Sequence, residues 1–563
     1  MKQTRVFLTG AYQNRGLSRR EALRTSACLV SAGTALSALP ACSEPAAAQR
    51  PGEDDSTFLE RVLQDTDPHI PVRSAPYQVN RTLVIPAGKT VTIDPDTQFA
   101  WTGPSGAADQ LIGVFEAGGD NVSISASRDA FVTCDQPSPF VYAALMRGHR
   151  GFSVTNIQAR ECGHVHVGPT VADYEQIILN SPGAAGNILI AGGGARYAAL
   201  QRAGHGACYL AFISDAQVRG ARYYNACNGV QWWGGDADPM HQPSQGLSQN
   251  ERKCRDLVIE NVVVEHCTAG GIWGSMGSNI VVRDCTVSDA GDVAYDAEGS
   301  NHVTFIRCTA RNGHNGCFTT FFLCNSVRIV DCTGIVDNKA FPLVRIYNAS
   351  QTNWDNVGLE VTGGSFECRD TSGPSTIDTA MGPVGTLLIT GAALKNVRID
   401  VAYSNMHRTM ITNNTLNLPY TLGTDAAIRA GCSKSLGNAP AITPGGVILE
   451  NNEIRYSPQQ NAAGTAVAIL LREDDFNSSA SDVVRNNKVS GPFQTGISLI
   501  NASTNTGIVP AFVLSGNRFE GLPPSATLLS VTRATPVSHE PTVKWDATQM
   551  RDGKAVSLSK ALD

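Results

Sequence analysis

One pattern recurs four times between Leu257 and Asn348, and it limits what the chain can fold into. Each copy has a run of β-branched residues, the pair Cys-Thr, a turn rich in Gly, Asn or Asp, and a second short run. The cysteines of the pairs recur after 18, 23 and 24 residues: Cys267, Cys285, Cys308 and Cys332. A repeat of this length, built from short strands and turns, predicts a solenoid rather than a closed globular sheet.

The composition fits a chain of many short strands and turns. Of 563 residues, 54 are Gly and 28 are Pro, while only 17% are charged. A solenoid grows by adding coils, so this length does not require several domains. The formal net charge of −6 argues against a dedicated nucleic-acid binder.

The N-terminal residues resemble an export signal. Arg19 and Arg20 precede a weakly apolar run over residues 27–39, which resembles a twin-arginine signal and is too short to span a bilayer. The four residues ending at Cys42 resemble a lipobox, so lipid attachment at Cys42 and cleavage near residues 46–48 are both open. We expect residues 1–48 to be a signal, residues 49–55 a linker, and the mature protein to be periplasmic, membrane-anchored or secreted.

The 15 cysteines raise the question of disulfides, which are common in exported proteins. Adjacent coils lie about 4.8 Å apart, so cysteines in the same slot of successive repeats can stack as small apolar groups. We expect all four Cys-Thr cysteines to share one such ladder. A metal site is disfavoured because the chain has no CxxC pair.

The pattern extends on both sides of the four copies. Residues 56–66 have helical spacing, with Ser56 as N-cap, and this helix would cover the open end of the first coil. Looser strand runs continue to residue 532, and residues 533–563 are expected to be a tail or an end cover. In the C-terminal half Asn occupies the turn slot, where its amide can satisfy backbone groups: Asn414, Asn452, Asn487 and Asn517.

The segment IPAGKTVTI at residues 85–93, together with the helix before it, resembles the first coil of pectate-lyase-like proteins and phage tailspikes. About 450 residues, from Val79 to Leu528, resemble that superfamily. The resemblance implies an all-β fold, a single-stranded right-handed parallel β-helix over residues 56–532. It also implies a polysaccharide partner, because polysaccharide lyases, glycoside hydrolases, epimerases and depolymerases dominate the superfamily. A monomer and a trimer are both open.

Three acids share one predicted strand over residues 291–299. Strand alternation places Asp292, Asp296 and Glu298, with Ala294, on one face and Val293 among the residues on the other. Because the interior of a coil is apolar, we expect the acids to face outward, compensated by a cationic side chain, a shared proton, or Ca²⁺ at Asp296 and Glu298. Same-face neighbours lie about 6.6 Å apart, within the roughly 6.5–9.5 Å carboxyl separation of inverting glycosidases.

The next two coils contribute His314, in a Gly/Asn turn, and Arg345, which is followed by Ile346 and Tyr347. An acid, Gly-His and Arg-Ile in successive coils resemble polygalacturonase-type hydrolases. The resemblance implies that the acids protonate the leaving oxygen and activate water while His314 and Arg345 hold substrate. Tyr347 stands where that family has Lys, and its Asn-Thr-Asp tripeptide is absent. The structural alternatives are a solvated acidic face, a turn histidine and an arginine that only neutralises the acids.

Aromatic residues lie close to this stretch in the sequence. Trp232 and Trp233 open a Gly-rich insert, and Trp273 is expected on the acids' side of its coil. Aromatic faces stack on sugar rings, so these three residues are candidate substrate-binding groups, with buried packing as the alternative. Asp236, in the same insert, and Tyr347 complete the candidate binding set.

Three functions are therefore open. A hydrolase would use one of Asp292, Asp296 and Glu298 as general acid and another to activate water, without a cofactor. A lyase acting on a uronic-acid polymer would use the acids for Ca²⁺ or for the substrate carboxylate, with Arg345 or His314 as base and Tyr347 as proton donor. A non-catalytic glycan-binding protein would use the same flank.

Overall fold

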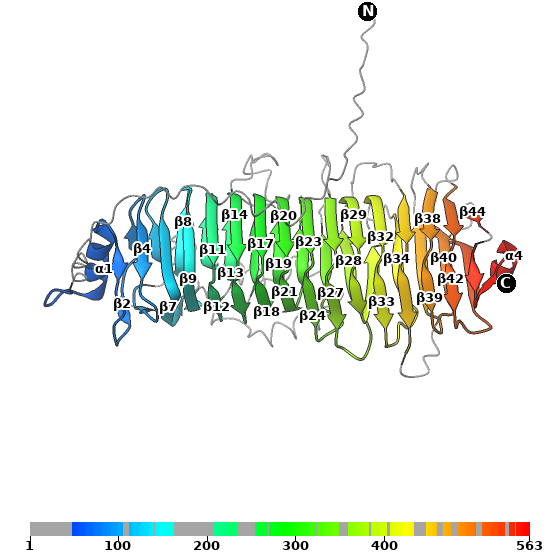
Figure 1. Cartoon of the computed structure of the whole chain (residues 1–563), viewed down its shortest axis with the longest axis horizontal. Helices are drawn as coiled ribbons and strands as arrows, with labels where there is room; N and C mark the ends of the chain where they lie inside the picture. Colours follow the sequence, from blue (N-terminus) through cyan, green and yellow to red (C-terminus); the bar gives the residue numbers. More distant parts are fainter. Residues whose placement is uncertain are drawn as a thin grey trace, which may run out of the picture. The chain divides into compact units, whose positions relative to one another are not determined.

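The computed structural model describes residues 48–104, 112–138, 141–162, 206–226, 228–234, 254–267, 269–321, 324–347, 358–381, 384–401, 406–432, 446–458, 465–473, 481–502, 509–534, 540–546 and 548–562. The expected export signal, with Cys42, lies outside these residues. The compact unit from Ala46 to Asp563 is a stack of parallel coils, with α1 at one end and α4 at the other (Figure 1). No helix in the described part is long and apolar enough to cross a membrane.

One wall of the stack is a 15-stranded parallel sheet, which carries the candidate site. Its strands, in order, are β3 (Leu83–Ile85), β6 (Ile112–Ala117), β8 (Val141–Arg147), β10 (Gly206–Ala211), β13 (Asn228–Trp233), β16 (Ile272–Ser275), β19 (Val293–Glu298), β22 (Gly316–Phe321), β25 (Val344–Tyr347), β28 (Ser375–Met381), β31 (Val397–Val401), β34 (Ala426–Cys432), β37 (Val467–Glu473), β40 (Thr495–Asn501) and β43 (Thr527–Arg533).

The other described strands form two further rows, joined into one 31-stranded sheet because the long strands β7 and β9 pair in both rows. They are β1 (His69–Ile70), β2 (Tyr77–Val79), β4 (Thr90–Ile93), β5 (Gln98–Trp101), β7 (Ser123–Ser138), β9 (Ser153–Cys162), β11 (Ser214–Arg219), β12 (Arg222–Tyr224), β14 (Cys254–Glu260), β15 (Val263–Glu265), β17 (Gly277–Arg283), β18 (Thr286–Ala290), β20 (Asn301–Ile306), β21 (Thr309–Gly313), β23 (Asn325–Val330), β24 (Thr333–Val336), β26 (Gly358–Thr362), β27 (Ser365–Cys368), β29 (Val384–Thr390), β30 (Ala393–Lys395), β32 (Met406–Thr412), β33 (Thr415–Leu418), β35 (Val447–Glu450), β36 (Glu453–Tyr456), β38 (Ser481–Arg485), β39 (Lys488–Ser490), β41 (Ala511–Ser515), β42 (Arg518–Glu520), β44 (Thr542–Trp545), β45 (Met550–Arg551) and β46 (Lys554–Ala555).

Inward side chains of successive coils form continuous apolar columns. In one column Ile259 is opposite Val282, Val282 is opposite Phe305, and Phe305 is opposite Ile329. All four are buried, as the alternation of apolar and polar residues along each strand predicts. Together these columns form one continuous apolar core in the described part of the stack, and the predicted all-β parallel β-helix is confirmed.

The cysteine ladder contains three of the four repeated cysteines. The threonine of each Cys-Thr pair donates its backbone N–H to the residue in the cysteine slot of the preceding coil. Thr333 N donates to Cys308 O and Thr309 N to Cys285 O, whereas Thr286 N donates to Val262 O. Val262, not Cys267, therefore occupies the slot before Cys285. Cys267 lies at the next turn of its coil, which corrects the expectation that all four share one slot and explains the short first spacing of 18 residues. Every cysteine whose side chain is described is buried, and the three ladder cysteines, Cys285, Cys308 and Cys332, are free, as the stacking interpretation predicts.

The asparagine ladder is confirmed at atomic detail. The Asn452 side chain donates from Nδ2 to Ile411 O and Asn487 Oδ1, and its own Oδ1 accepts from the Asn414 backbone and side chain. Asn414, Asn452, Asn487 and Asn517 are each at most 1% exposed. The residue before each slot takes a left-handed conformation, as at Asn451 with φ 56° and Asn486 with φ 57°, which Asn and Gly tolerate best.

Both ends of the stack are covered. Helix α1 (Asp55–Gln64) begins one residue before the expected start, and its N-cap is Asp54 rather than Ser56. The hydroxyl of Ser56 instead accepts from Asn80 N and ties the helix to the first coil. At the other end β44 and β45 pair with β41 and β42, so residues beyond 532 add one more coil before α4 (Leu558–Leu562).

Candidate active site

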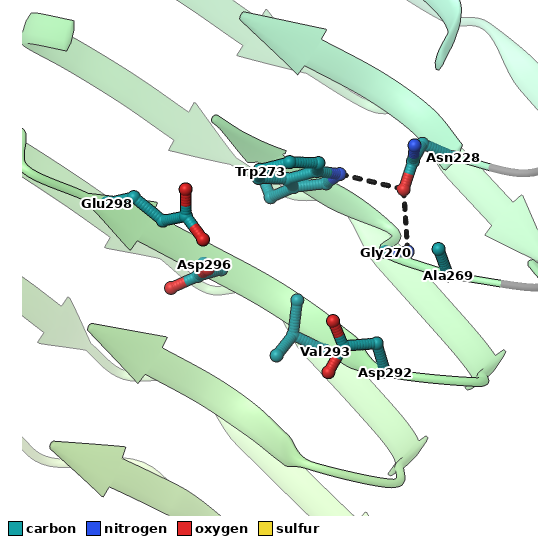
Figure 2. Close-up of a pocket in the computed structure, with 8 residues that line it drawn as sticks. All are labelled: Asn228, Ala269, Gly270, Trp273, Asp292, Val293, Asp296 and Glu298. Carbon is teal, nitrogen blue, oxygen red and sulfur yellow. Dashed lines mark hydrogen bonds between the residues drawn. The ribbon is translucent and has the colours of Figure 1, made fainter. Parts of the chain in front are cut away.

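A pocket of about 310 Å³, open solvent included, lies on the outer face of the 15-stranded sheet around β19 (Figure 2). Its lining residues come from β13, the turn before β16, β16 itself and β19: Asn228, Ala269, Gly270, Trp273, Asp292, Val293, Asp296 and Glu298. The structure thus brings the three predicted acids together with Trp273. Figure 2 shows Asp296 and Glu298 towards one end of β19, and Asp292 beside Val293 at its start.

Register explains how residues distant in sequence meet here. Trp273 on β16 is opposite Asp296 on β19, and Asp296 is opposite Thr319 on β22. The same column continues to Gln231 on one side and to Arg345 on the other. Each step is one strand spacing, about 4.8 Å, so Trp273 and Asp296 are direct neighbours whereas Arg345 is two coils away from Asp296.

The expected alternation of the acidic strand fails at its first two residues. Val293 lines the outer pocket, although it was predicted to face inward, and Ala294 packs in the core, although it was predicted to face outward. Val293 is the first residue of β19 and directly follows a turn, so strand alternation does not yet fix its direction. From Tyr295 onward the prediction holds, with Tyr295 and Ala297 inside and Asp296 on the outer pocket.

The three acids line the pocket, but they are less exposed to solvent than acids on an outward-facing strand would be. Asp296 is 2% exposed and Asp292 is 5% exposed, while Glu298 is only partly buried. Burial raises the pKa of Asp296 well above its ordinary value, the Thr319 hydroxyl opposes the rise, and the nearby Asp292 carboxylate adds to it. Within the described structure Asp296 Oδ1 accepts no hydrogen bond. Asp296 is therefore a carboxyl group suited to holding a proton.

Trp273 forms one wall of the pocket and is held in place by Asn228. The indole Nε1 donates to Asn228 Oδ1 over 2.8 Å, and the same oxygen accepts from Gly270 N over 2.7 Å. Both side chains are almost fully covered, at 8% exposed for Trp273 and 2% for Asn228. One amide oxygen thus fixes both the turn before β16 and the ring beside Asp296.

Arg345 does not contact the acids. It is 6% exposed and donates from Nε and Nη2 to the two carboxylate oxygens of Asp378, at 3.0 and 2.8 Å, and from Nη1 to Asn315 Oδ1. This two-bond pairing is with Asp378, so it gives no support to the alternative in which Arg345 only neutralises the acidic strand. The guanidinium has only donors and no acceptor, so it does not suit the role of a base.

His314 lies at the turn before β22 and does not line the pocket. Its ring stacks on Phe341 with centroids 4.4 Å apart, and the residue is 3% exposed. Burial lowers the pKa of His314 to about 4, while the Asp289 carboxylate acts in the opposite direction. The catalytic role expected for His314 is therefore replaced by a packing role.

The aromatic candidates separate into different environments. Trp232 is fully buried in the core, which corrects its expected binding role, because its position on β13 points inward. Trp233 lies on the outer face, partly exposed, against a small apolar cluster of Leu145, Tyr209 and Ala211. Tyr347 ends β25 opposite Phe321, but its side chain is outside the described part, as is all of Asp236.

The acids do not match the calcium site considered from the sequence. Within the described ranges no three His, Cys, Asp or Glu side chains come together as a possible metal site.

Sequence reasoning missed Asn228, Thr319 and Asp378, which touch or flank the predicted residues. Asn228 is separated from Trp273 by 45 positions and Asp378 from Arg345 by 33, because inserts lengthen those coils. An uninterrupted coil spans 23 residues, as from Cys285 to Cys308. Thr319, 23 residues after Asp296, could have been found by that spacing alone.

The comparisons with known proteins agree with this architecture. The family model described as right handed beta helix region matches residues 241–369, and no curated protein matches the sequence. The chain is a right-handed parallel β-helix protein, which confirms the resemblance drawn from its repeats.

Three solved structures illustrate the range of similar folds. The catalytic unit of an α-1,3-glucanase from Streptomyces thermodiastaticus is 13% identical with a TM-score of 0.37, covering 92% of this chain and 72% of that one. The A-module of the mannuronan C-5 epimerase AlgE6 from Azotobacter vinelandii is 13% identical with a TM-score of 0.35, covering 82% and 91%. PfbA, a surface adhesin of Streptococcus pneumoniae, is 11% identical with a TM-score of 0.29, covering 87% and 92%. At these values the likeness concerns the fold alone.

Proposed function

We propose that the chain is an exported enzyme that hydrolyses glycosidic bonds of a polysaccharide in the pocket on β19. The observation that carries this proposal is the unequal environment of carboxyl groups on one strand. Asp296 is buried and has a raised pKa, whereas Glu298 in the same pocket is partly exposed. Paired carboxyl groups in unlike environments are the arrangement that general acid and base catalysis requires.

In this mechanism Asp296 is the general acid and donates its proton to the leaving glycosidic oxygen. Glu298 accepts a proton from the attacking water, because its partial exposure lets water approach it. Their backbone positions are about 6.6 Å apart along the strand, compatible with an intervening water in an inverting reaction. Asp292, at the start of the strand, adds negative charge that helps Asp296 retain its proton.

Two tryptophans would contact the sugar. Trp273 borders Asp296, and Trp233 lies on the same outer face, one strand further from β19. Trp233 is partly exposed and offers indole surface for stacking on the apolar face of a sugar ring, whereas Trp273, 8% exposed, offers only its edge of the pocket wall. The lyase alternative gains no support from its base candidates, because Arg345 is paired with Asp378 and His314 is stacked on Phe341.

The proposal is tested by incubating the protein with neutral and acidic polysaccharides and measuring both reducing ends and ultraviolet absorbance. We expect new reducing ends without unsaturated product. Asp296→Asn and Glu298→Gln should each lower kcat by roughly 10²–10⁴-fold, the usual contribution of a general acid or base. Glu265→Gln, an exposed acid on β15 in the other sheet, is the matched control and should leave kcat unchanged.

Two other results would contradict the proposal. Unsaturated product absorbing in the ultraviolet would indicate a lyase. Glycan binding that survives the double variant, with no product from the wild-type chain, would indicate a binding protein. Export is tested separately by fractionating cells for the full chain and for a chain with Arg19 and Arg20 both replaced by Lys.

A further inference from the structure

A second polar cluster lies on the same outer face, beyond the acid pocket. Asp378 on β28 is opposite Asp400 on β31, and Asp400 is opposite Arg429 on β34. These residues continue the column that contains Asp296, Thr319 and Arg345. Asp400 lies four strand spacings from Asp296, about 19 Å at roughly 4.8 Å each. Figure 1 labels β28 and β34, and β31 is between them.

Within this cluster the aspartates are not equally satisfied. Asp378 accepts two bonds from Arg345 and a third from the Thr376 hydroxyl. Asp400 uses only Oδ2, which accepts a hydrogen bond from Arg398 Nη1 over 2.9 Å. Arg429 Nη1 is 3.7 Å from the same Oδ2, beyond hydrogen-bond distance.

The other oxygen of Asp400, Oδ1, has no hydrogen-bond partner in the described structure, although the residue is only 9% exposed. Leaving such an acceptor unmet is costly. Arg398 makes its contacts with Asp400 and Asp425 through Nη1, so further N–H donors remain on a side chain that is 17% exposed. The cluster therefore combines an unused acceptor with unused donors.

This pairing of groups defines the chemistry of a ligand. A sugar hydroxyl both donates and accepts, so neighbouring hydroxyls of one sugar can satisfy Asp400 Oδ1 and an Arg398 N–H together. An anionic sugar suits the cluster less, because each of the three arginines is already paired with an aspartate: Arg345 with Asp378, Arg398 with Asp400 and Asp425, and Arg429 with Asp400. The three aspartates balance the three arginines, so the cluster offers a substrate carboxylate no net positive charge.

We infer that Asp400 and Arg398 form a sugar-binding subsite for an uncharged glycan, occupied by a distant unit of the chain whose scissile bond lies at Asp296. This inference rests on the proposed function and deepens it, since it names neutral polysaccharides as the substrate class. The subsite lies on the C-terminal side of the pocket and Trp233 on the N-terminal side, so glycan contacts extend in both directions from the acids.

Affinity electrophoresis of the full chain tests the inference, with dextran, laminarin and galactomannan as neutral probes and polygalacturonate and alginate as acidic ones. The measurements are made in the Asp296→Asn background, so that cleavage does not alter the gel. We expect retardation by at least one neutral probe, and a loss of affinity of about tenfold or more in Asp400→Asn and in Arg398→Gln, since hydrogen bonds to charged groups contribute that much. Arg455→Gln, on β36 in the other sheet, is the control for loss of one positive charge.

The outcomes separate this inference from the proposed function. Retardation by acidic probes alone, or unchanged affinity of both subsite variants for the neutral probe, overturns the inference. If the chain cleaves a neutral glycan and the KM is the same in the subsite variants as in the parent chain, the hydrolase proposal stands and the subsite is wrong. If glycan binding depends on Asp400 but the wild-type chain cleaves no glycan, the subsite stands and the hydrolase proposal is wrong. If Asp400→Asn fails to fold, Arg398→Lys, which keeps the charge and loses the planar fork, gives the same comparison.

Discussion

The indole Nε1 of Trp273 donates to Oδ1 of Asn228 over 2.8 Å, and this bond joins the wall of the pocket to the strand two coils before the acids. Trp273 is the register neighbour of Asp296 and lines the same pocket, so we expect the position of its ring to affect how much water reaches that carboxyl group. Asn228 is therefore a positioning residue that acts through Trp273.

Replacing Asn228 by Ala should change the pH dependence of hydrolysis. The indole loses its acceptor, water enters the pocket, and the pKa of Asp296 falls towards its ordinary value because burial is the main cause of its rise. A general acid must be protonated, so the high-pH limb of the kcat/KM profile should move to lower pH. Asn417→Ala, at an exposed site on β33, is the control and should not move the limb. An unshifted limb with uniformly lower kcat would mean that Asn228 only supports the fold.

The Asp296 carboxyl should also make stability depend on pH. Its pKa is raised in the folded chain above the ordinary 3.8, so the folded state binds the proton more tightly than the unfolded state. The contribution of Asp296 to the free energy of unfolding is therefore fully present below about pH 3.8, and it is lost as the pH rises through the folded pKa. Asn cannot ionise, so the Tm of Asp296→Asn should exceed that of the wild type at neutral pH, and the difference should vanish in acid.

Thermal unfolding measured across pH checks this prediction. Asp284→Asn serves as the opposite-sign control, because the hydrogen bond with Arg307 lowers the pKa of Asp284 and any stabilisation from it is lost in acid. Parallel Tm curves for the wild type and Asp296→Asn would contradict a raised pKa in the folded state.

Much of the fold could be predicted because each coil of a solenoid repeats both the structure and the sequence pattern of the coil before it. The apolar columns, the Asn452 ladder and the buried cysteines all follow from one coil pattern. The prediction was wrong at Cys267, because the Cys-Thr pair occurs at two different turns of the coil. Only the backbone hydrogen bonds between coils show at which turn a given pair lies.

The site could be predicted as a strand of acids, but not its neighbours. Alternation correctly placed Asp296 on the outer face, yet it could not show that Trp273 and Asn228 cover it. Arg345 was grouped with the acids because an acid, Gly-His and Arg-Ile follow one another in successive coils, whereas its partner Asp378 belongs to a later coil. Residues on successive coils meet by register, and inserts of unequal length conceal that register from the sequence.

His314 should make the fold sensitive to acid. Burial lowers its pKa from 6.5 to about 4, so the folded chain resists protonation that the unfolded chain accepts. Stability is full above about pH 6.5 and falls as the pH decreases towards 4, by an amount of about 3 kcal/mol for a shift of this size. In His314→Leu, which keeps an apolar contact with Phe341, this loss should be absent. An identical fall in Tm between pH 6.5 and 4 in both proteins would contradict the assignment.

The two ladders should differ in their contribution to stability. Asn452→Ala leaves one backbone carbonyl, Ile411 O, and one backbone amide, Asn414 N, without the bond to the Asn452 side chain in a buried turn. The side chains of Asn414 and Asn487 lose one bond each. Each unmet buried group costs about 1–3 kcal/mol, so this variant should unfold at a much lower denaturant concentration than the wild type. Cys308→Ala removes only one small apolar group and a weak thiol donor, and it should cost about 1 kcal/mol. Equal losses for the two variants would mean that the amide bonds add little beyond packing.

The adjacent residues Trp232 and Trp233 should separate packing from binding. Trp232 is fully buried against Gly274 and Gly277, so Trp232→Ala opens a cavity and should cost about 3–5 kcal/mol in unfolding experiments. Trp233 is partly exposed on the outer face, so Trp233→Ala should leave Tm nearly unchanged and raise KM for polysaccharide by roughly twofold to tenfold, the range of one aromatic contact. A lower Tm in Trp233→Ala without a change in KM would place that ring in the scaffold rather than in the substrate path.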